Sequence, residues 1–96
     1  MSDACLITAG AELTIVHAGE LKQSWLAQIE PAHKQVRLSL ADVQEMDSAG
    51  VQLLIALQRH LLQEGKTMVV QTPSRVVRDV LDLFALNAHF DVGASH

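Results

Sequence analysis

The sequence predicts a small α/β domain with a mostly parallel sheet. Short apolar segments typical of strands alternate with longer segments that have helical spacing, an order that favours parallel pairing with right-handed crossovers. The chain has 96 residues, of which 49% are hydrophobic, enough for one two-layer core. Neither a repeat nor a linker divides it, so we expect a single domain over residues 1–96, with helices on one or both faces of the sheet.

Two short strands are expected first, over residues 4–8 and 12–17. The break between them, Ala9 to Ala11, has the length of a hairpin turn. A helix follows, because the apolar period changes after Gly19 and Pro31 ends the segment. Its apolar residues at helical spacing are Leu21, Trp25, Leu26 and Ile29.

A third strand is predicted over residues 36–40, and the clearest helix over residues 51–62. One face of this helix is apolar, formed by Val51, Leu54, Ile55, Leu61 and Leu62 and widened by Leu53 and Leu57. Gly65 supplies a stop signal after it. Residues 67–71 then form a short apolar strand of the kind found buried in sheets.

The third helix has its own start signal. Thr72 is expected as the N-cap, with Pro73 at the first helical position. An apolar stripe follows and ends near Asn87, after which residues 88–92 form an optional last strand. The predicted order is therefore β-β-α-β-α-β-α with this strand at the end.

Composition excludes several classes of partner. The net charge is −4 without a Lys/Arg run, which disfavours nucleic acid and anionic membranes as partners. The apolar runs span only a few residues, too short to cross a bilayer. Residues 1–3 lack the basic region of a secretory signal, and a lone Cys5 fits a reducing compartment. We therefore expect a cytoplasmic protein with a buried, structural thiol at Cys5.

An enzyme is not predicted. The five histidines are scattered and none has metal-ligand spacing with Cys, Asp or Glu. The five glycines are isolated, so there is no phosphate-binding loop. Cys5 lacks a Cys-x-x-Cys partner, and no Gly-x-Ser-x-Gly elbow surrounds Ser48. We expect no catalytic residues, no metal and no cofactor.

The most informative segment runs from Glu45 to Gly50, between a predicted strand and the long helix. It places the hydroxyl of Ser48 at the first turn of that helix, on a surface loop. Helix N-termini carry partial positive charge and unpaired N–H groups, so they tolerate an added anion such as phosphate. The alternative is that Asp47 or Ser48 simply caps the helix, the commoner role of these residue types.

These residues resemble the STAS domain, the fold of bacterial anti-sigma factor antagonists (anti-anti-sigma factors). Met46-Asp47-Ser48-Ala49-Gly50 matches the family's Asp-Ser-x-Gly loop around a phosphorylated serine. Gly19-Glu20-Leu21 resembles its Gly-Glu-Leu-Asp, and residues 76–90 resemble its amphipathic helix with a Leu-x-x-x-Phe ending. The resemblance covers about residues 6–90. It implies a mixed sheet of four to five strands, with mostly parallel core strands, packed by three to four helices.

The resemblance also implies partner switching in signal transduction and transcription regulation. In this family the unphosphorylated domain binds a kinase-type anti-sigma factor; the kinase phosphorylates the loop serine, here Ser48, and a phosphatase restores it. The phosphate adds about −1.5 to −2 charge, which a helix N-terminus tolerates, so affinity is expected to be lost at the interface rather than through unfolding. Asp47 is expected to hold the turn, and Gly50 to permit close approach of a partner. The predicted partner-binding residues are Asp47, Ser48, Ala49, Gly50, Gln52, Arg59 and Lys22.

Two positions depart from the family pattern. Lys22 stands where the family often has Asp, and Ser39 where it commonly has Asp at the end of the third strand. Both positions are expected near the serine loop, so these changes favour an acidic or phosphorylated partner, or are neutral surface changes. Two alternative functions remain open: the STAS subunit of a phospholipid-trafficking ABC transporter, clamping its ATPase without phosphorylation, and a STAS regulator that works with a chemosensory kinase in a two-component pathway. Neither involves nucleic acid or membrane insertion.

Overall fold

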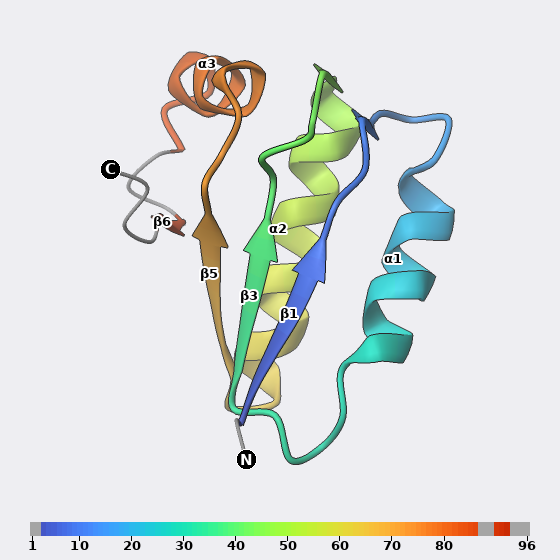
Figure 1. Ribbon diagram of the computed structural model, residues 1–96, viewed down its shortest axis with the longest axis vertical. Helices are drawn as coiled ribbons and strands as arrows, with labels where there is room; N and C mark the ends of the chain where they lie inside the picture. Colours follow the sequence, from blue (N-terminus) through green and yellow to red (C-terminus); the bar gives the residue numbers. More distant parts are fainter. Residues whose placement is uncertain (1–2, 87–89, 93–96) are drawn as a thin grey trace.

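The computed structural model confirms the α/β class and describes residues 3–86 and 90–92. One or two strands precede each helix along the chain (Figure 1). They are β1 (Ala4–Thr8), β2 (Glu12–Leu13), α1 (Ala18–Gln28), β3 (Gln35–Ser39), β4 (Glu45–Met46), α2 (Ser48–Gln63), β5 (Thr67–Gln71), α3 (Arg75–Leu83) and β6 (Asp91–Val92). Among the described helices, none is long and apolar enough to cross a membrane.

The main sheet has four strands in the order β1-β3-β5-β6, and all its pairs are parallel. Buried side chains alternate with outward ones along each central strand, and the register aligns them across the sheet. Two rows point into the core: Cys5, Val36 and Met68, and beside them Ile7, Leu38 and Val70. Because successive side chains of a strand point to opposite faces of the sheet, each side chain's position in the strand determines the face on which it lies.

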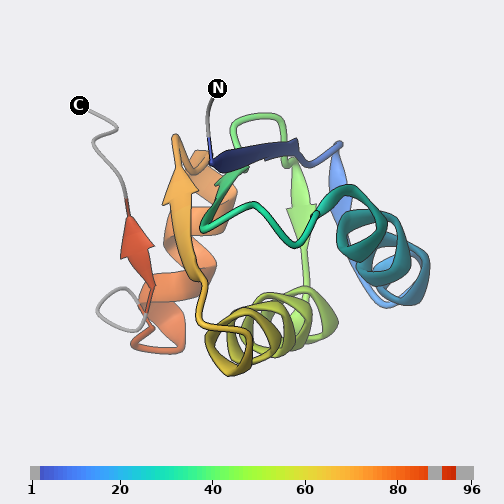
Figure 2. The same cartoon turned by 90° about the horizontal axis from the view of Figure 1, so that it is seen from below.

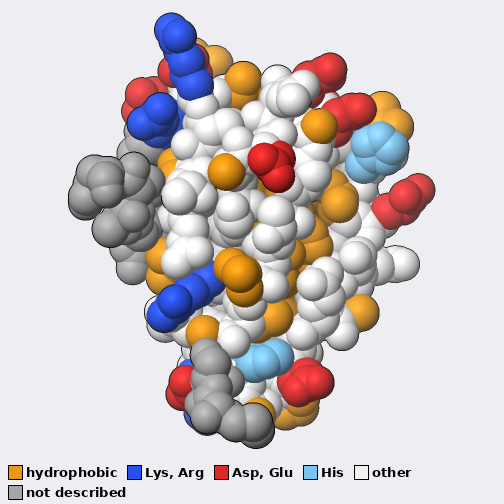
Figure 3. Space-filling view, viewed as in Figure 1, with side chains coloured by type: hydrophobic (Ala, Val, Ile, Leu, Met, Phe, Trp, Pro, Cys, Tyr) orange, Lys and Arg blue, Asp and Glu red, His pale blue; other side chains and the backbone are white. Residues whose placement is uncertain are grey.

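The helices cover only one face of this sheet (Figures 1 and 2). α1 and α2 lie side by side on that face, and α3 lies beyond the end of β5. α2 contributes most to the core, through Gly50, Val51, Leu53, Leu54, Leu57 and Leu61. The opposite face is covered by no helix of the described chain. It carries side chains such as Leu6, Arg37 and Val69, which pair across the strands, and it is largely neutral (Figure 3).

The predicted N-terminal hairpin is wrong. β1 pairs with β3, whereas β2 pairs with β4 in a separate two-stranded parallel sheet. The second strand also ends at Leu13 rather than at residue 17, because the chain turns there: the amides of His17 and Ala18 both donate to the carbonyl of Thr14. The turn leaves Ile15 76% exposed, whereas Leu13, the last residue of β2, is buried.

The start and end of α3 differ from the prediction. Ser74 is the N-cap, and its hydroxyl accepts a hydrogen bond of 3.2 Å from the amide of Val77. Thr72 instead has a φ of 42°, outside the conformation of an N-cap. The helix ends at Leu83 rather than near Asn87, which lies outside the described residues. Leu62 is also exposed, at 61%, against the predicted apolar face of α2.

Three details of the core concern single residues. Gly65 has a φ of 75° and ends α2 as predicted, since a left-handed conformation favours glycine there. Cys5 is buried as predicted; burial and, secondarily, the charge of Glu30 raise the pKa of its thiol. Lys66 was not foreseen in the core. It is 5% exposed, and its ammonium donates to the carbonyls of residues 30, 31 and 33 at 3.3, 3.1 and 2.6 Å.

Candidate partner-binding site

Asp47 caps α2 and ties it to the turn that follows β2. One carboxylate oxygen accepts hydrogen bonds from the amides of Ala49 and Gly50, at 2.9 and 3.2 Å. The other accepts from the amide of Ile15, 32 residues away, at 3.1 Å. The hydrogen bond from Ile15 is the largest cause that lowers the pKa of Asp47; desolvation, the next largest, opposes it, and the bonds from Gly50 and Ala49 add to the lowering. Asp47 therefore holds the turn at the start of α2, as predicted, and it also holds the turn that follows β2.

Ser48 is the first residue of α2 and its side chain is exposed. Asp47 supplies the cap, as the capping alternative expected of one of these two residues, so the Ser48 hydroxyl does not have that role. Its hydroxyl makes no hydrogen bond within the part of the chain that the structure describes. A solvent-exposed, unengaged hydroxyl on a rigid helical turn is sterically open to modification.

Gly50 is buried, and its missing side chain serves a contact inside the molecule. A Cβ atom added there would overlap the carbonyl oxygen of Leu13 and approach the Leu13 Cβ to 3.0 Å. We expected this glycine to permit the close approach of a partner; in the structure it permits the close approach of β2. The backbone contact and the Asp47 hydrogen bonds together hold the start of α2 against residues 13–15.

An open groove of about 620 Å³ lies between α1 and the first half of α2. It brings together Lys22, Ser48, Ala49 and Gln52, four of the predicted partner-binding residues. The rest of its lining is apolar or small: Ile15, Ala18, Gly19, Leu53 and Ala56. Among the described residues, Lys22 is thus the only charged one in the lining, which makes the groove suited to a protein surface that is mostly apolar.

At the rim of the groove lies an exposed aliphatic side chain that sequence reasoning missed, Ile15, and a second one, Val16, follows it in the chain. Ile15 and Val16 are 76% and 72% exposed, on the turn that Asp47 holds. Neighbouring exposed aliphatic residues are a mark of protein-binding surfaces. Because residues 12–17 were predicted to form a strand, the exposure of both neighbouring side chains was not foreseen.

Two other residues lie away from the groove. Arg59 is exposed on α2 but is not part of the groove lining. Ser39 lies at the end of β3, where its hydroxyl is 3.3 Å from that of Thr72. Of the two positions that depart from the family pattern, only Lys22 shares the groove with Ser48.

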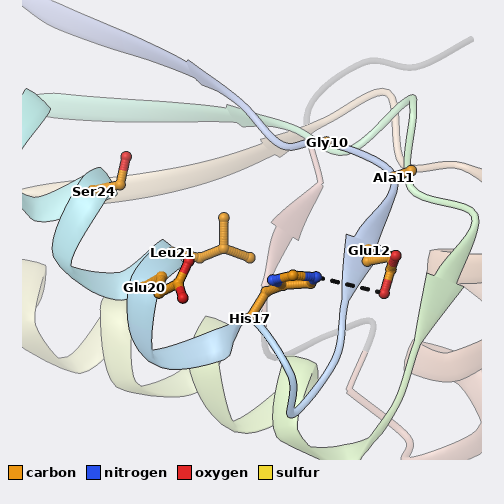
Figure 4. Close-up of a pocket in the computed structure, with 7 residues that line it drawn as sticks. All are labelled: Gly10, Ala11, Glu12, His17, Glu20, Leu21 and Ser24. Carbon is orange, nitrogen blue, oxygen red and sulfur yellow. Dashed lines mark ion pairs between the residues drawn. The ribbon is translucent and has the colours of Figure 1, made fainter.

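A second, smaller hollow of about 430 Å³ lies on the other side of the turn (Figure 4). His17 and Glu12 form an ion pair across it, with 3.9 Å between Nε2 and Oε1, and α1 contributes Glu20, Leu21 and Ser24. Within the described residues no group of three or more His, Cys, Asp or Glu is placed to hold a metal ion. Glu20, which belongs to the Gly-Glu-Leu motif, therefore lines a different hollow from Ser48.

The comparisons with known proteins agree with this fold. TM1081 from Thermotoga maritima, a candidate anti-sigma factor antagonist, has a similar crystal structure, with a TM-score of 0.82 and 21% sequence identity over 96% of this chain and 80% of that chain. The NMR structure of TM1081 gives a TM-score of 0.79 and 20% identity, over 96% of this chain and 74% of that one. No curated protein matches the sequence.

At these identities the solved structures show a shared fold. The family is shown by sequence: the model described as "Mlab, STAS domain" matches residues 1–92, almost the whole chain. The predicted STAS fold is confirmed, with parallel strands packed by three helices in the described residues. The chain belongs to the STAS domain family.

Proposed function

We propose that this protein is a cytoplasmic regulatory module of the anti-sigma factor antagonist type, which acts by binding and is switched at Ser48. One observation carries the proposal: Ser48 presents an exposed hydroxyl in a groove that also contains Lys22 and Gln52, while Asp47 performs the capping. Capping is the ordinary reason for a serine at this position. Because Asp47 already fulfils it, the Ser48 hydroxyl remains available for a partner or a kinase.

In the unphosphorylated state, the groove binds a kinase-type anti-sigma factor and keeps it from its sigma factor. The kinase transfers the γ-phosphoryl group of ATP to Ser48 Oγ; the hydroxyl proton goes to a base of the kinase and ADP leaves. A phosphatase then uses water to release inorganic phosphate and restore the hydroxyl. The chain itself supplies only the acceptor oxygen and the docking surface.

The phosphate acts on the groove rather than on the fold. The amides of Ala49 and Gly50, which a phosphate at a helix N-terminus ordinarily uses, already bind the Asp47 carboxylate. Lys22 lines the same groove and is the cation available to the phosphate. A phosphorylated Ser48 therefore fills the groove, neutralises Lys22 and adds charge beside Asp47, and each effect weakens a docked partner.

A second function is favoured by the family match and by the groove lining. The matching family's description names Mlab and the STAS domain and names no anti-sigma factor. A groove with one cation and several small or apolar residues also suits a permanent contact, such as that of a STAS subunit clamping a transporter ATPase. In that case the Ser48 hydroxyl is an interface contact without a phosphate. A chemosensory kinase as the partner remains a third possibility.

Capture from native lysate distinguishes these functions. The baits are the wild type, Ser48→Ala, Ser48→Asp and a control, Ser24→Asp, which adds the same charge at an exposed serine outside the groove. The switch predicts that a kinase-type anti-sigma factor binds every bait except Ser48→Asp, and that mass spectrometry finds phosphate on Ser48. Recovery of a transporter ATPase by all four baits, without phosphate on Ser48, refutes the switch and supports the clamp.

A further inference from the structure

We propose that the groove between α1 and α2 takes an amphipathic helix of the partner protein, and that Lys22 selects a helix with a carboxylate beside its apolar face. This rests on the proposed function only in taking the groove as the partner-binding surface. It adds the shape and the charge of the segment that binds there. The evidence is the length of the groove, its exposed aliphatic rim and its single charge.

The floor of the groove has the length of two helical turns. Its α2 residues are Ser48, Ala49, Gln52, Leu53 and Ala56, which form one stripe along the helix. At 1.5 Å per residue, the eight steps from Ser48 to Ala56 span about 12 Å. Small residues from both helices, Ala18 and Gly19 on α1 and Ala49 and Ala56 on α2, let a third backbone approach closely. A partner helix lying along this stripe would place two or three anchor side chains in it.

The rim supplies apolar contact that is already held in place. Ile15 and Val16 are exposed, but the turn that carries them is fixed by the bond between the Ile15 amide and Asp47 and by two amides that donate to Thr14. A rigid surface loses less conformational freedom on binding than a flexible one. Ile15, which belongs to the lining, is therefore placed to cover the apolar side of a helix seated in the groove.

The charge of the groove determines which helix is favoured. Lys22 is the only charged residue of the lining within residues 3–86 and 90–92, in a chain whose net charge is −4. Its ammonium has no ion-pair or hydrogen-bond partner among the residues that the structure describes. A carboxylate on the incoming helix would pair with it, whereas a Lys or Arg at that point would be repelled. Such pairs mainly set specificity and association rate.

The test uses two synthetic peptides of about 15 residues, long enough to form a helix. Both have the same Leu/Ala apolar face, flanked by Glu in one and by Lys in the other. Each is titrated into the ¹⁵N-labelled full chain and followed by amide chemical shifts. The proteins are the wild type, Lys22→Glu, Lys22→Gln and the control Lys34→Glu, which makes the same charge change at an exposed lysine outside the groove.

We expect the Glu peptide to shift the amides around Ile15, Lys22 and Gln52, and to bind the wild type about two- to fivefold more tightly than the Lys peptide does. Lys22→Glu should reverse that preference, Lys22→Gln should remove it and Lys34→Glu should preserve it. Equal binding of both peptides to the wild type, or shifts confined to the open sheet face, would overturn the proposal. If the groove amides shift on dilution without peptide, a second copy of this chain occupies the groove, and that result would also overturn the proposal.

This experiment is independent of phosphorylation. If Ser48 is never phosphorylated but the Glu peptide is preferred, the switch fails and this inference stands. If the native partner is lost with Ser48→Asp but neither peptide is preferred, the inference fails and the switch stands. The amide spectrum of each variant also shows whether it is folded, so a misfolded Lys22→Glu is recognised and Lys22→Gln decides the result.

Discussion

Polar side chains at the two ends of α2 differ in whether they have partners inside the molecule. At the C-terminal end, Gly65 stops the helix and the next residue, Lys66, is 5% exposed with its ammonium bound to three carbonyls of the loop before β3. At the N-terminal end, Ser48 and Lys22 line an open groove, and neither side chain has a polar partner in the described structure.

The difference separates residues that hold the fold from residues left for a partner. Two lysines of the same chain illustrate it: Lys66 has its charge satisfied inside the molecule, and Lys22 does not. Asp47 is at the groove end but belongs with Lys66, because both of its oxygens bind backbone amides. Gly50 belongs there too, since its role is the contact with Leu13. At the groove end, a structural layer formed by Asp47 and Gly50 thus lies beneath a binding layer formed by Ser48 and Lys22.

The largest effect should come from that structural layer. Gly50→Ala forces a methyl group against the Leu13 backbone, so we expect a loss of about 2–3 kcal/mol in the free energy of unfolding. The matched control is Gly19→Ala, where an added Cβ has nothing within 4 Å. Its helical position makes that change neutral or slightly stabilising. Urea unfolding of both variants measures the comparison, and equal stability would show that β2 moves away freely.

Disrupting the contacts at the C-terminal end of α2 should lower the free energy of unfolding by nearly as much. Lys66→Met keeps the length of the side chain but leaves three loop carbonyls without their donor, and we expect a loss of about 1–3 kcal/mol. Lys34→Met, at an exposed lysine, should change stability by less than about 0.5 kcal/mol. Partner capture at 25 °C should be unaffected by either. A loss of binding in folded Lys66→Met would mean that the two ends are coupled.

The effect of Asp47 should depend on pH. Its pKa is lowered in the folded chain, so its contribution is fully present above the ordinary carboxyl pKa and is lost as the pH falls through the lowered value. Asp47→Asn should therefore reduce the urea midpoint at pH 7, by less than Lys66→Met does. The difference from the wild type should narrow below about pH 4. A pH-independent difference would mean that the amide bonds do not need the charge.

The smallest effect should come from the binding layer itself. Ser48→Asp places a negative charge at the first turn of α2, where the helix dipole favours it and Asp47 opposes it. We expect stability to change by less than about 0.5 kcal/mol in thermal or urea unfolding. Loss of partner binding by this variant would then be an interface effect. A strongly destabilised Ser48→Asp would instead make the switch one of folding.

The sequence predicted the elements that have a clear apolar pattern. The helix α2 was predicted from its apolar face, and the strands β1 and β5 were predicted to the residue. The strand β4 was missed because its two residues are too few to show a period. The predicted hairpin was wrong because a three-residue break can equally connect two strands that belong to different sheets. The position of Asp47 and Ser48 at the start of a helix was predicted from their residue types, but only the structure shows which of the two caps it. Lys66 was unpredictable because its partners lie more than 30 residues away.

The order of strands in the main sheet has a consequence for how the chain is made. β1, β3, β5 and β6 are neighbours in the same order in which they leave the ribosome. Each strand therefore docks on the edge of the one before it, and none has to insert between two that are already paired. Since parallel pairing must wait for a crossover, β1 stays unpaired until residues 35–39 have emerged. After that point the nascent main sheet extends in a single direction, and its last strand always offers a free edge to the next strand of that sheet.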